Sequence, residues 1–252
     1  MKVLDFRGVS WSWLEDFRRG LSTTTENTLA FCQLADRAVV MGARAIELER
    51  VHSDYCKANG IPVIRSVLPH GETGYSDSGE FRVCAAINNT SGYAISSTNM
   101  GRRYLSKVII AALNFLNINA DWEGCNIFVS GKKIGAVTAY QFSDVILLKS
   151  HVFLDWDIDT AEKAIISPKH DMRERIRTLK QLGKDVSFDE LKDAVKQAFQ
   201  QVFGITLEGE LPNKELVDGI KASIEGLHPK YASETWLKYG KWSPVKDYWR
   251  PE

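Results

Sequence analysis

The chain lacks a net charge, a long apolar run and a recognisable targeting segment. Its 252 residues contain 32 lysines and arginines against 32 aspartates and glutamates, so no overall field draws it to nucleic acid or to an acidic membrane. No run reaches the roughly 20 apolar residues that cross a bilayer, and the first residues lack the apolar core of a signal peptide. We therefore expect a cytoplasmic protein that binds neither nucleic acid nor membrane.

Closely spaced cysteines are also missing. Cys32, Cys56, Cys84 and Cys125 are scattered along the chain, without the CxxC spacing of a zinc site or the density of a disulfide scaffold. The spacing predicts buried thiols and no metal site. Cys125 could instead be a nucleophile, but nothing in the sequence places a histidine base beside it.

Linkers, internal repeats and low-complexity stretches are absent as well, and the seven prolines are spread out. Hydrophobic residues at 44% and charged residues at 25% are typical of a folded globular chain. We expect one domain over residues 1–252, with helices in its C-terminal part from about residue 160.

The pattern of apolar residues alternates between the strand and the helix period. Glycine and proline set the expected ends of several segments. Strands are expected at Thr28–Leu34, Arg37–Gly42, Ile61–Arg65 and Phe81–Ile87, helices at Leu48–Asn59 before Gly60 and at Asn99 to about Leu116, and a long loop at Ser66–Glu80.

Two β-branched runs flank a Ser-Gly turn, which favours an antiparallel hairpin of Asn126–Ser130 and Lys132–Tyr140 around Gly131. Further on, Ser187 and Glu190 have the spacing of a capping box, and another helix is expected near Pro212. Strands and helices followed by terminal helices predict an α+β fold, a mixed β-sheet with packed helices.

Lys133 is the first candidate functional residue. A lysine at a hairpin turn, followed by the small residues Gly135 and Ala136, could present a point charge to a phosphate or carboxylate. It could equally be a solvated turn lysine. The basic tract Lys169–Arg175 is best explained as a solvated helical face with internal ion pairs, and Trp236, Trp242 and Trp249 as packing anchors.

The second candidate is the segment that begins at Arg65 and ends at Gly79. It includes the loop that contains His70 and Gly71. A glycine-bearing loop after a strand can present amides to an anion, with the arginine adding a fixed charge. A plain surface loop is the alternative. His70 could act as an acid or base near neutral pH, although a lone loop histidine is more often simply exposed.

In their order along the chain, these segments resemble the lipoate-protein ligase A family of the biotin and lipoate ligases and octanoyltransferases. Gly60–Arg65 is similar to the strand and arginine before that family's lipoate-binding loop, Tyr75–Gly79 to the end of the loop, and Asn126–Gly135 to its signature hairpin. Met172–Ile176 resembles an arginine-bearing segment, and Lys230–Trp236 a closing motif.

The resemblance implies the catalytic-domain fold of biotin and lipoate protein ligases, with ATP, Mg²⁺ and lipoate as ligands. It implies that Lys133 is the essential lysine that contacts the acyl-adenylate and that a lipoyl-carrier domain accepts the acyl group, with a separate accessory subunit possible. The residues that it implies bind substrate or nucleotide are Arg65, His70, Gly71, Tyr75, Asp77, Gly79, Ile134, Gly135 and Ala136.

The loop differs from the family pattern, because Pro69, His70, Gly71 and Glu72 stand where the family has consecutive glycines. Two alternatives to an ATP-dependent ligase therefore remain. One is a non-catalytic relative that binds a lipoylated domain or a partner subunit. The other is an acyltransferase that needs no ATP, for which Cys125 is the nearby thiol.

Overall fold

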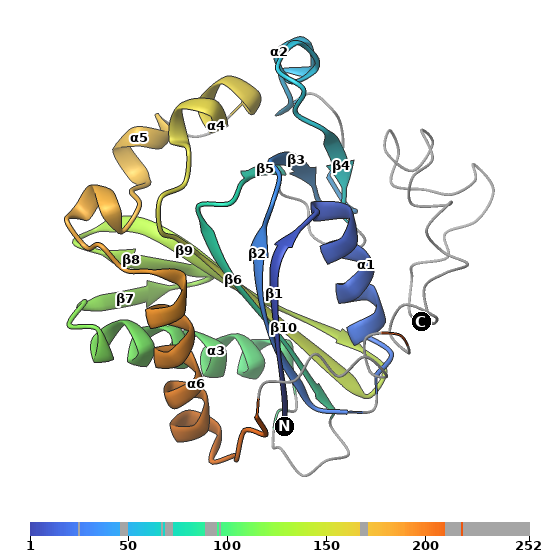
Figure 1. Ribbon diagram of the computed structural model, residues 1–252, viewed down its shortest axis with the longest axis vertical. Helices are drawn as coiled ribbons and strands as arrows, with labels where there is room; N and C mark the ends of the chain where they lie inside the picture. The colour runs from blue at the N-terminus through green and yellow to red at the C-terminus, as the bar shows by residue number, and fades with distance from the viewer. Residues whose placement is uncertain are drawn as a thin grey trace.

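The computed structural model describes residues 1–24, 26–45, 50–66, 68, 73–88, 95, 97–166, 171–209 and 218. In these ranges the chain forms a large mixed sheet, a small second sheet and packed helices, which confirms the α+β prediction (Figure 1). The strands are β1 (Lys2–Val9), β2 (Thr28–Leu34), β3 (Ala38–Met41), β4 (Val63–Arg65), β5 (Thr73–Ser76), β6 (Glu80–Asn88), β7 (Ala120–Glu123), β8 (Asn126–Val129), β9 (Lys132–Phe142) and β10 (Val145–Phe153). The helices are α1 (Trp11–Leu21), α2 (Ser53–Ala58), α3 (Thr98–Phe115), α4 (Ile158–Ala164), α5 (Met172–Arg175) and α6 (Phe188–Phe203), with a 3₁₀ turn at Lys180–Leu182.

The large sheet has seven strands in the order β1-β2-β6-β10-β9-β8-β7. Only β1 and β2 pair in parallel, connected through α1, and every other neighbouring pair is antiparallel. The small sheet has the order β4-β3-β5, with β3 parallel to β4 and antiparallel to β5. Strands β6 and β10 therefore each have a neighbouring strand on both sides. Residues in the middle of these strands are buried wherever a helix covers the face of the sheet on which they lie.

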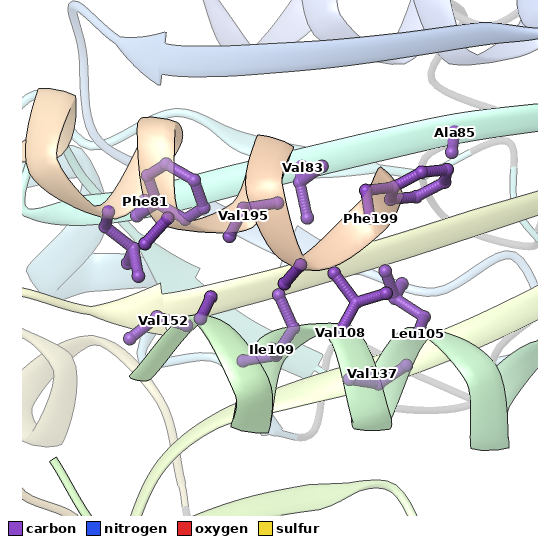
Figure 2. Packing of buried hydrophobic residues seen from close by; sticks show 14 of the residues in the cluster. Phe81, Val83, Ala85, Leu105, Val108, Ile109, Val137, Val152, Val195 and Phe199 are labelled. Atoms are coloured by element: carbon purple, nitrogen blue, oxygen red, sulfur yellow. The ribbon is translucent and has the colours of Figure 1, made fainter. Parts of the chain in front are cut away.

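One face of the large sheet is covered by α3 and α6, which also pack against each other. Figure 2 shows Val83 of β6 near Val195 of α6, with Val108 on the α3 helix, and the three residues belong to the largest buried apolar cluster. Strict alternation along β6 sends Phe81, Val83 and Ala85 to this face. The capping box predicted at the start of α6 is confirmed, since the Ser187 hydroxyl accepts from the Glu190 amide and the Glu190 carboxylate accepts from the Ser187 amide.

The opposite face is covered by α1 (Figure 1). Ser10 caps this helix by accepting a hydrogen bond from the Trp13 amide at 3.1 Å. The apolar stripe of α1, Leu14, Phe17 and Leu21, packs in one cluster with residues of β2, β6 and β10. The same helix carries Glu15 and Arg18 into the interior, which matters for the site described below.

Several sequence predictions need correction. The helix predicted at Leu48–Asn59 begins only at Ser53, because Val51 is extended and bridges Ile165; Leu48 and Glu49 lie outside the described residues. The segment predicted as a loop contains strand β5, because residues 73–76 pair with β3. Strands β1, β7 and β10 and helix α1 were not among the predicted elements.

Two predictions about side chains are also wrong. Cys125 is half-buried rather than buried, and Arg102 Nη1 donates to its Sγ at 3.1 Å. In the basic tract, Arg173 pairs with Asp159 and Glu162 of α4 instead of within the tract. The expected helix near Pro212, the three C-terminal tryptophans and the closing motif lie outside the described residues. Within the described part of the chain, no helix combines the length and apolarity needed to span a membrane.

Candidate functional site

Lys133 lies near the start of strand β9, just after the predicted hairpin turn. Ser130 and Gly131 form the turn with φ of 50° and 71°, and β8 and β9 pair antiparallel on either side of it, as predicted. Lys133 also bridges Ile176 in parallel, and its carbonyl accepts from the Arg177 amide at 3.1 Å. The residue is therefore half-buried with a fixed backbone, not a freely solvated turn lysine.

The three residues after Lys133 have different surroundings. Ile134 is buried in the cluster under α3. A Cβ on Gly135 would lie 2.2 Å from the backbone oxygen of His151, so the close approach that this glycine allows is to β10 of the same chain. Ala136 is half-buried and pairs with His151. The pairing of β8 with β9 shifts register at this point, with one extra residue in β9. Lys133 and Ala136 therefore lie on the same face of the sheet, although residues three positions apart in a regular strand lie on opposite faces.

Arg65, at the end of β4, is 4% exposed. Its Nη1 donates to the carbonyls of Gly42 at 2.9 Å and Ala45 at 2.8 Å, and burial lowers the pKa of the guanidinium. These bonds fix the segment after β3, and a phosphate contact through the rest of the guanidinium stays a prediction. His70 and Gly71 lie outside the described residues.

Asp77 and Gly79 join the turn between β5 and β6 to the start of α4. The Asp77 carboxylate accepts from the Gly79 amide at 2.8 Å and from the Asp157 amide at 2.9 Å, and burial raises its pKa. A Cβ on Gly79 would lie 2.3 Å from the Asp155 carbonyl oxygen. The hydrogen bonds of the Asp77 carboxylate and the close approach at Gly79 are to the protein's own backbone, and their role in binding stays a prediction.

An aromatic row connects this region with the surroundings of Lys133. Tyr75 lies 6.0 Å from Trp156 between ring centroids, Trp156 stacks on Phe153 at 4.5 Å, and Phe153 lies 5.1 Å from His151. Burial raises the pKa of Tyr75 and lowers that of His151 well below 6.5, with Arg82 and Lys133 adding to the effect on His151. The imidazole beside Lys133 is accordingly neutral at pH 7.

The sequence did not reveal a group of charged and thiol side chains under α1. Glu15 and Arg18 of α1 meet Arg82 and Cys84 of β6 and Lys149 of β10, and we call these five residues the α1-face cluster. Arg18 donates to Glu15 at 2.8 Å and to the Cys84 sulfur at 3.4 Å. Two charged residues within largely apolar strands, Arg82 in Glu80–Asn88 and Lys149 in Val145–Phe153, are signals that could have pointed to this cluster.

Register explains how the cluster forms, because directly opposed residues of antiparallel strands share a face. One row across the sheet is Cys32, Arg82, His151 and Ala136, and the next is Ala30, Cys84, Lys149 and Thr138. The sheet therefore places Lys149 one row away from His151, the neighbour of Lys133. Burial lowers the pKa of Lys149 to about 7, reinforced by Arg18 and opposed by Glu15.

The fold and the lysine-bearing hairpin together define a lipoate ligase type of catalytic domain. The family model of the lipoyl protein ligase A/B catalytic domain matches residues 9–200. The chain belongs to this family, which confirms the resemblance predicted from the sequence.

Solved structures agree on the fold. The chain is 20% identical to the bi-partite lipoate protein ligase of Thermoplasma acidophilum, with a TM-score of 0.78 and 94% of each chain covered. It is 20% identical to a lipoate-protein ligase A bound with ATP, with a TM-score of 0.78, covering 94% of this chain and 97% of that one. With LipL1 of P. falciparum, in complex with lipoate, the identity is 16% and the TM-score 0.75, covering 96% of this chain and 74% of that one. Comparison with curated protein sequences found no match.

Proposed function

We propose that this protein attaches lipoate, or a related acyl group, to a lysine of a lipoyl-carrier domain by way of an acyl-adenylate. Membership of the lipoyl ligase family supports the reaction class. The observation that carries the proposal is the position of Lys133, a half-buried lysine on a strand held between β8, β10 and the segment after α5.

The proposed reaction has two steps. An oxygen of the acyl carboxylate attacks the α-phosphorus of ATP, and pyrophosphate leaves. The carrier lysine amine then attacks the acyl carbon, AMP leaves with the bonding electrons, and the amine loses a proton. In both steps negative charge lies on the acyl and phosphate oxygens, which a positioned cation stabilises.

Lys133 would supply that cation rather than act as a base. Its backbone is fixed by the β8 pairing and by the hydrogen bond from Arg177, so little reorganisation accompanies charge development. His151 next to it is neutral and adds no competing charge. Arg65 would contribute to phosphate binding from the neighbouring small sheet.

ATP, lipoate and Mg²⁺ are the proposed ligands. One structural relative is described with ATP and another with lipoate. Among the described residues, no group of three or more histidine, cysteine, aspartate or glutamate side chains could hold a metal. Mg²⁺ is usually held through substrate phosphates with few protein carboxylates, so we propose that it enters with the nucleotide.

The proposed partner is a lipoyl-carrier domain, and the Thermoplasma relative is described together with its E2 lipoyl domain. That relative is also described as bi-partite, which supports the proposal that a separate accessory subunit assists this chain. We further propose that residues 1–252 act as one domain in the cytoplasm.

The test is the mass of a purified lipoyl-carrier domain after incubation with the protein, ATP, Mg²⁺ and lipoate or octanoate. We expect a gain of one acyl group that requires ATP and is lost in Lys133→Ala. Lys107→Ala, which removes an exposed lysine of α3, is the matched control. No gain with wild type, even with candidate accessory subunits, would favour the non-catalytic binder.

A gain from an acyl-carrier donor without ATP would instead favour the transferase alternative. Cys125 is partly accessible and contacts Arg102, so Cys125→Ser separates the two routes. Unchanged transfer by Cys125→Ser would exclude a thioester at this residue.

A further inference from the structure

Glu15 is an acidic residue on the buried face of α1. Its side chain forms an ion pair with Arg18 at 2.8 Å, and the two residues are 5% and 0% exposed. Replacing a buried ion pair by well-packed apolar residues often leaves a protein equally stable or makes it more stable. Stability alone therefore does not explain an acid at this position, and the other carboxylate oxygen of Glu15 has a partner outside the helix.

That partner is the hydroxyl of Ser66, which donates to Glu15 Oε2 at 2.5 Å across a separation of 51 residues in the chain. Ser66 is 0% exposed and directly follows Arg65, the last residue of β4. Burial opposes ionisation of Glu15, but Arg18 and Lys149 outweigh it, and the pKa of the Glu15 carboxyl lies below its ordinary value. The carboxylate is therefore ionised at pH 7, and the bond between α1 and the end of β4 is charge-assisted.

Ser66 sets the path of the chain as it leaves β4. Its amide donates to the Met41 carbonyl at 2.7 Å, and its hydroxyl accepts from the Leu68 amide at 3.1 Å. The Leu68 carbonyl accepts from the Ala43 amide at 3.2 Å. These bonds join the end of β4 to the segment after β3, and α1 contributes the hydrogen bond of Glu15.

The position of Arg65 depends on the same arrangement. Arg65 pairs with Met41 of β3, and its Nη1 donates to the carbonyls of Gly42 and Ala45 in the segment after β3. A shift of Ser66, the next residue, would move the end of β4 relative to that segment. The guanidinium of Arg65 would move with it.

We propose that Glu15 is a positioning residue, which acts through Ser66 to hold the end of β4 where Arg65 meets the phosphates of ATP. This inference rests on the proposed function, in which Arg65 contributes to phosphate binding. The role requires no contact between Glu15 and substrate. A buried carboxylate suits it, because a hydrogen bond to a charged group is stronger than one between neutral groups, and because misplacing a binding group by about 1 Å weakens its contacts strongly.

Two substitutions remove the contact in different ways. Ser66→Ala deletes the hydroxyl and leaves the ion pair of Glu15 with Arg18 intact. Glu15→Gln keeps the size of the side chain but offers one acceptor oxygen to two donors. We expect each variant to bind ATP at least about fivefold more weakly in calorimetry, since a bond to a charged group is lost. The KM for ATP in carrier acylation should rise in step, with kcat within about twofold of wild type.

The double variant tests whether Glu15 acts through Ser66. Because both substitutions remove one hydrogen bond, the double variant should bind ATP within about twofold of the weaker single variant. Circular dichroism checks that each variant folds, and Ser66→Ala alone decides the question should Glu15→Gln fail to fold.

Ser187→Ala is the matched control. It removes the serine hydroxyl that caps α6, a helix that packs in the apolar cluster on the other face of the large sheet. It should lower the melting temperature, as loss of a cap does, and leave ATP binding within about twofold of wild type.

Each other outcome overturns the inference. Unchanged ATP binding in Ser66→Ala and Glu15→Gln would do so and leave the ligase proposal standing. A loss of ATP binding that Ser187→Ala shares in proportion to its lower stability would assign Glu15 a purely structural role. Effects that add in the double variant would mean that Glu15 acts by a route other than Ser66. A wild type that neither binds ATP nor acylates the carrier would overturn the proposed function as well.

Discussion

Replacing Lys149 by methionine should flatten the dependence of stability on pH. Burial lowers the pKa of the Lys149 amine from 10.5 to about 7, with Arg18 and Arg82 acting in the same direction and Glu15 opposing them in part. Between these two values the unfolded chain holds a proton that the folded chain lacks. The stability of the wild type must therefore rise with pH in this window. The loss of stability that comes from the lowered pKa of Lys149 is fully present below pH 7.

The magnitude follows from about 1.4 kcal/mol per pH unit for one proton. From pH 7 to pH 9 the upper limit is about 2.7 kcal/mol. Because the Lys149 side chain is partly accessible, we expect about half of this. Methionine keeps the length of the side chain without the charge, so Lys149→Met should be more stable than wild type at pH 7, with a difference that shrinks towards pH 9.

The assay is denaturant unfolding of wild type and Lys149→Met at pH 7, 8 and 9 without ligand, with Lys107→Met of α3 as the control for an exposed lysine. The control should follow the wild type at each pH. A constant difference between Lys149→Met and wild type across the range would refute the reasoning, since it would mean that the amine titrates alike in the folded and unfolded chain.

Further predictions concern Lys133, Asp77 and Gly135. Lys133→Ala should lower acyl transfer at least about 100-fold, as loss of a charge-stabilising contact does, while the melting temperature changes by a few degrees at most; retained transfer would remove Lys133 from the mechanism. Asp77→Ala leaves two amides without their acceptor and should lower the unfolding free energy by about 1–3 kcal/mol, whereas the exposed Asp121→Ala should change it by less than about 0.5 kcal/mol. In Gly135→Ala the added Cβ clashes with the His151 carbonyl, so the unfolding free energy should fall by about 1–3 kcal/mol. Gly74→Ala places its Cβ in open space and should leave the unfolding free energy nearly unchanged. Equal effects of the two variants within either pair, measured by chemical denaturation, would contradict these assignments.

Local signals predicted the parts of the fold that depend on neighbouring residues. The Ser-Gly turn between two β-branched runs predicted the β8–β9 hairpin, and Ser187 with Glu190 predicted the start of α6. Both devices act within a few residues of chain, so the sequence contains all their partners. The order of motifs along the chain similarly indicated the family and Lys133.

Predictions were less accurate where a distant segment decides the local structure. Val51 is extended because Ile165, far along the chain, bridges it, and β5 forms because β3 offers an edge. The sequence suggested that Gly135 lets a ligand approach the backbone. Only the register of β9 against β10 shows that His151 occupies that space.

The sequence by itself determined the fold class, the hairpin and the position of Lys133 within it, because turn chemistry and apolar periodicity are short-range properties. Only the tertiary structure decided that Arg18, Arg82 and Lys149 meet in one interior. These residues come from α1, β6 and β10, and their proximity depends on the register of antiparallel strands that are far apart in sequence. The position of these three basic side chains near Glu15 is a property of that register and of the helix packed over it.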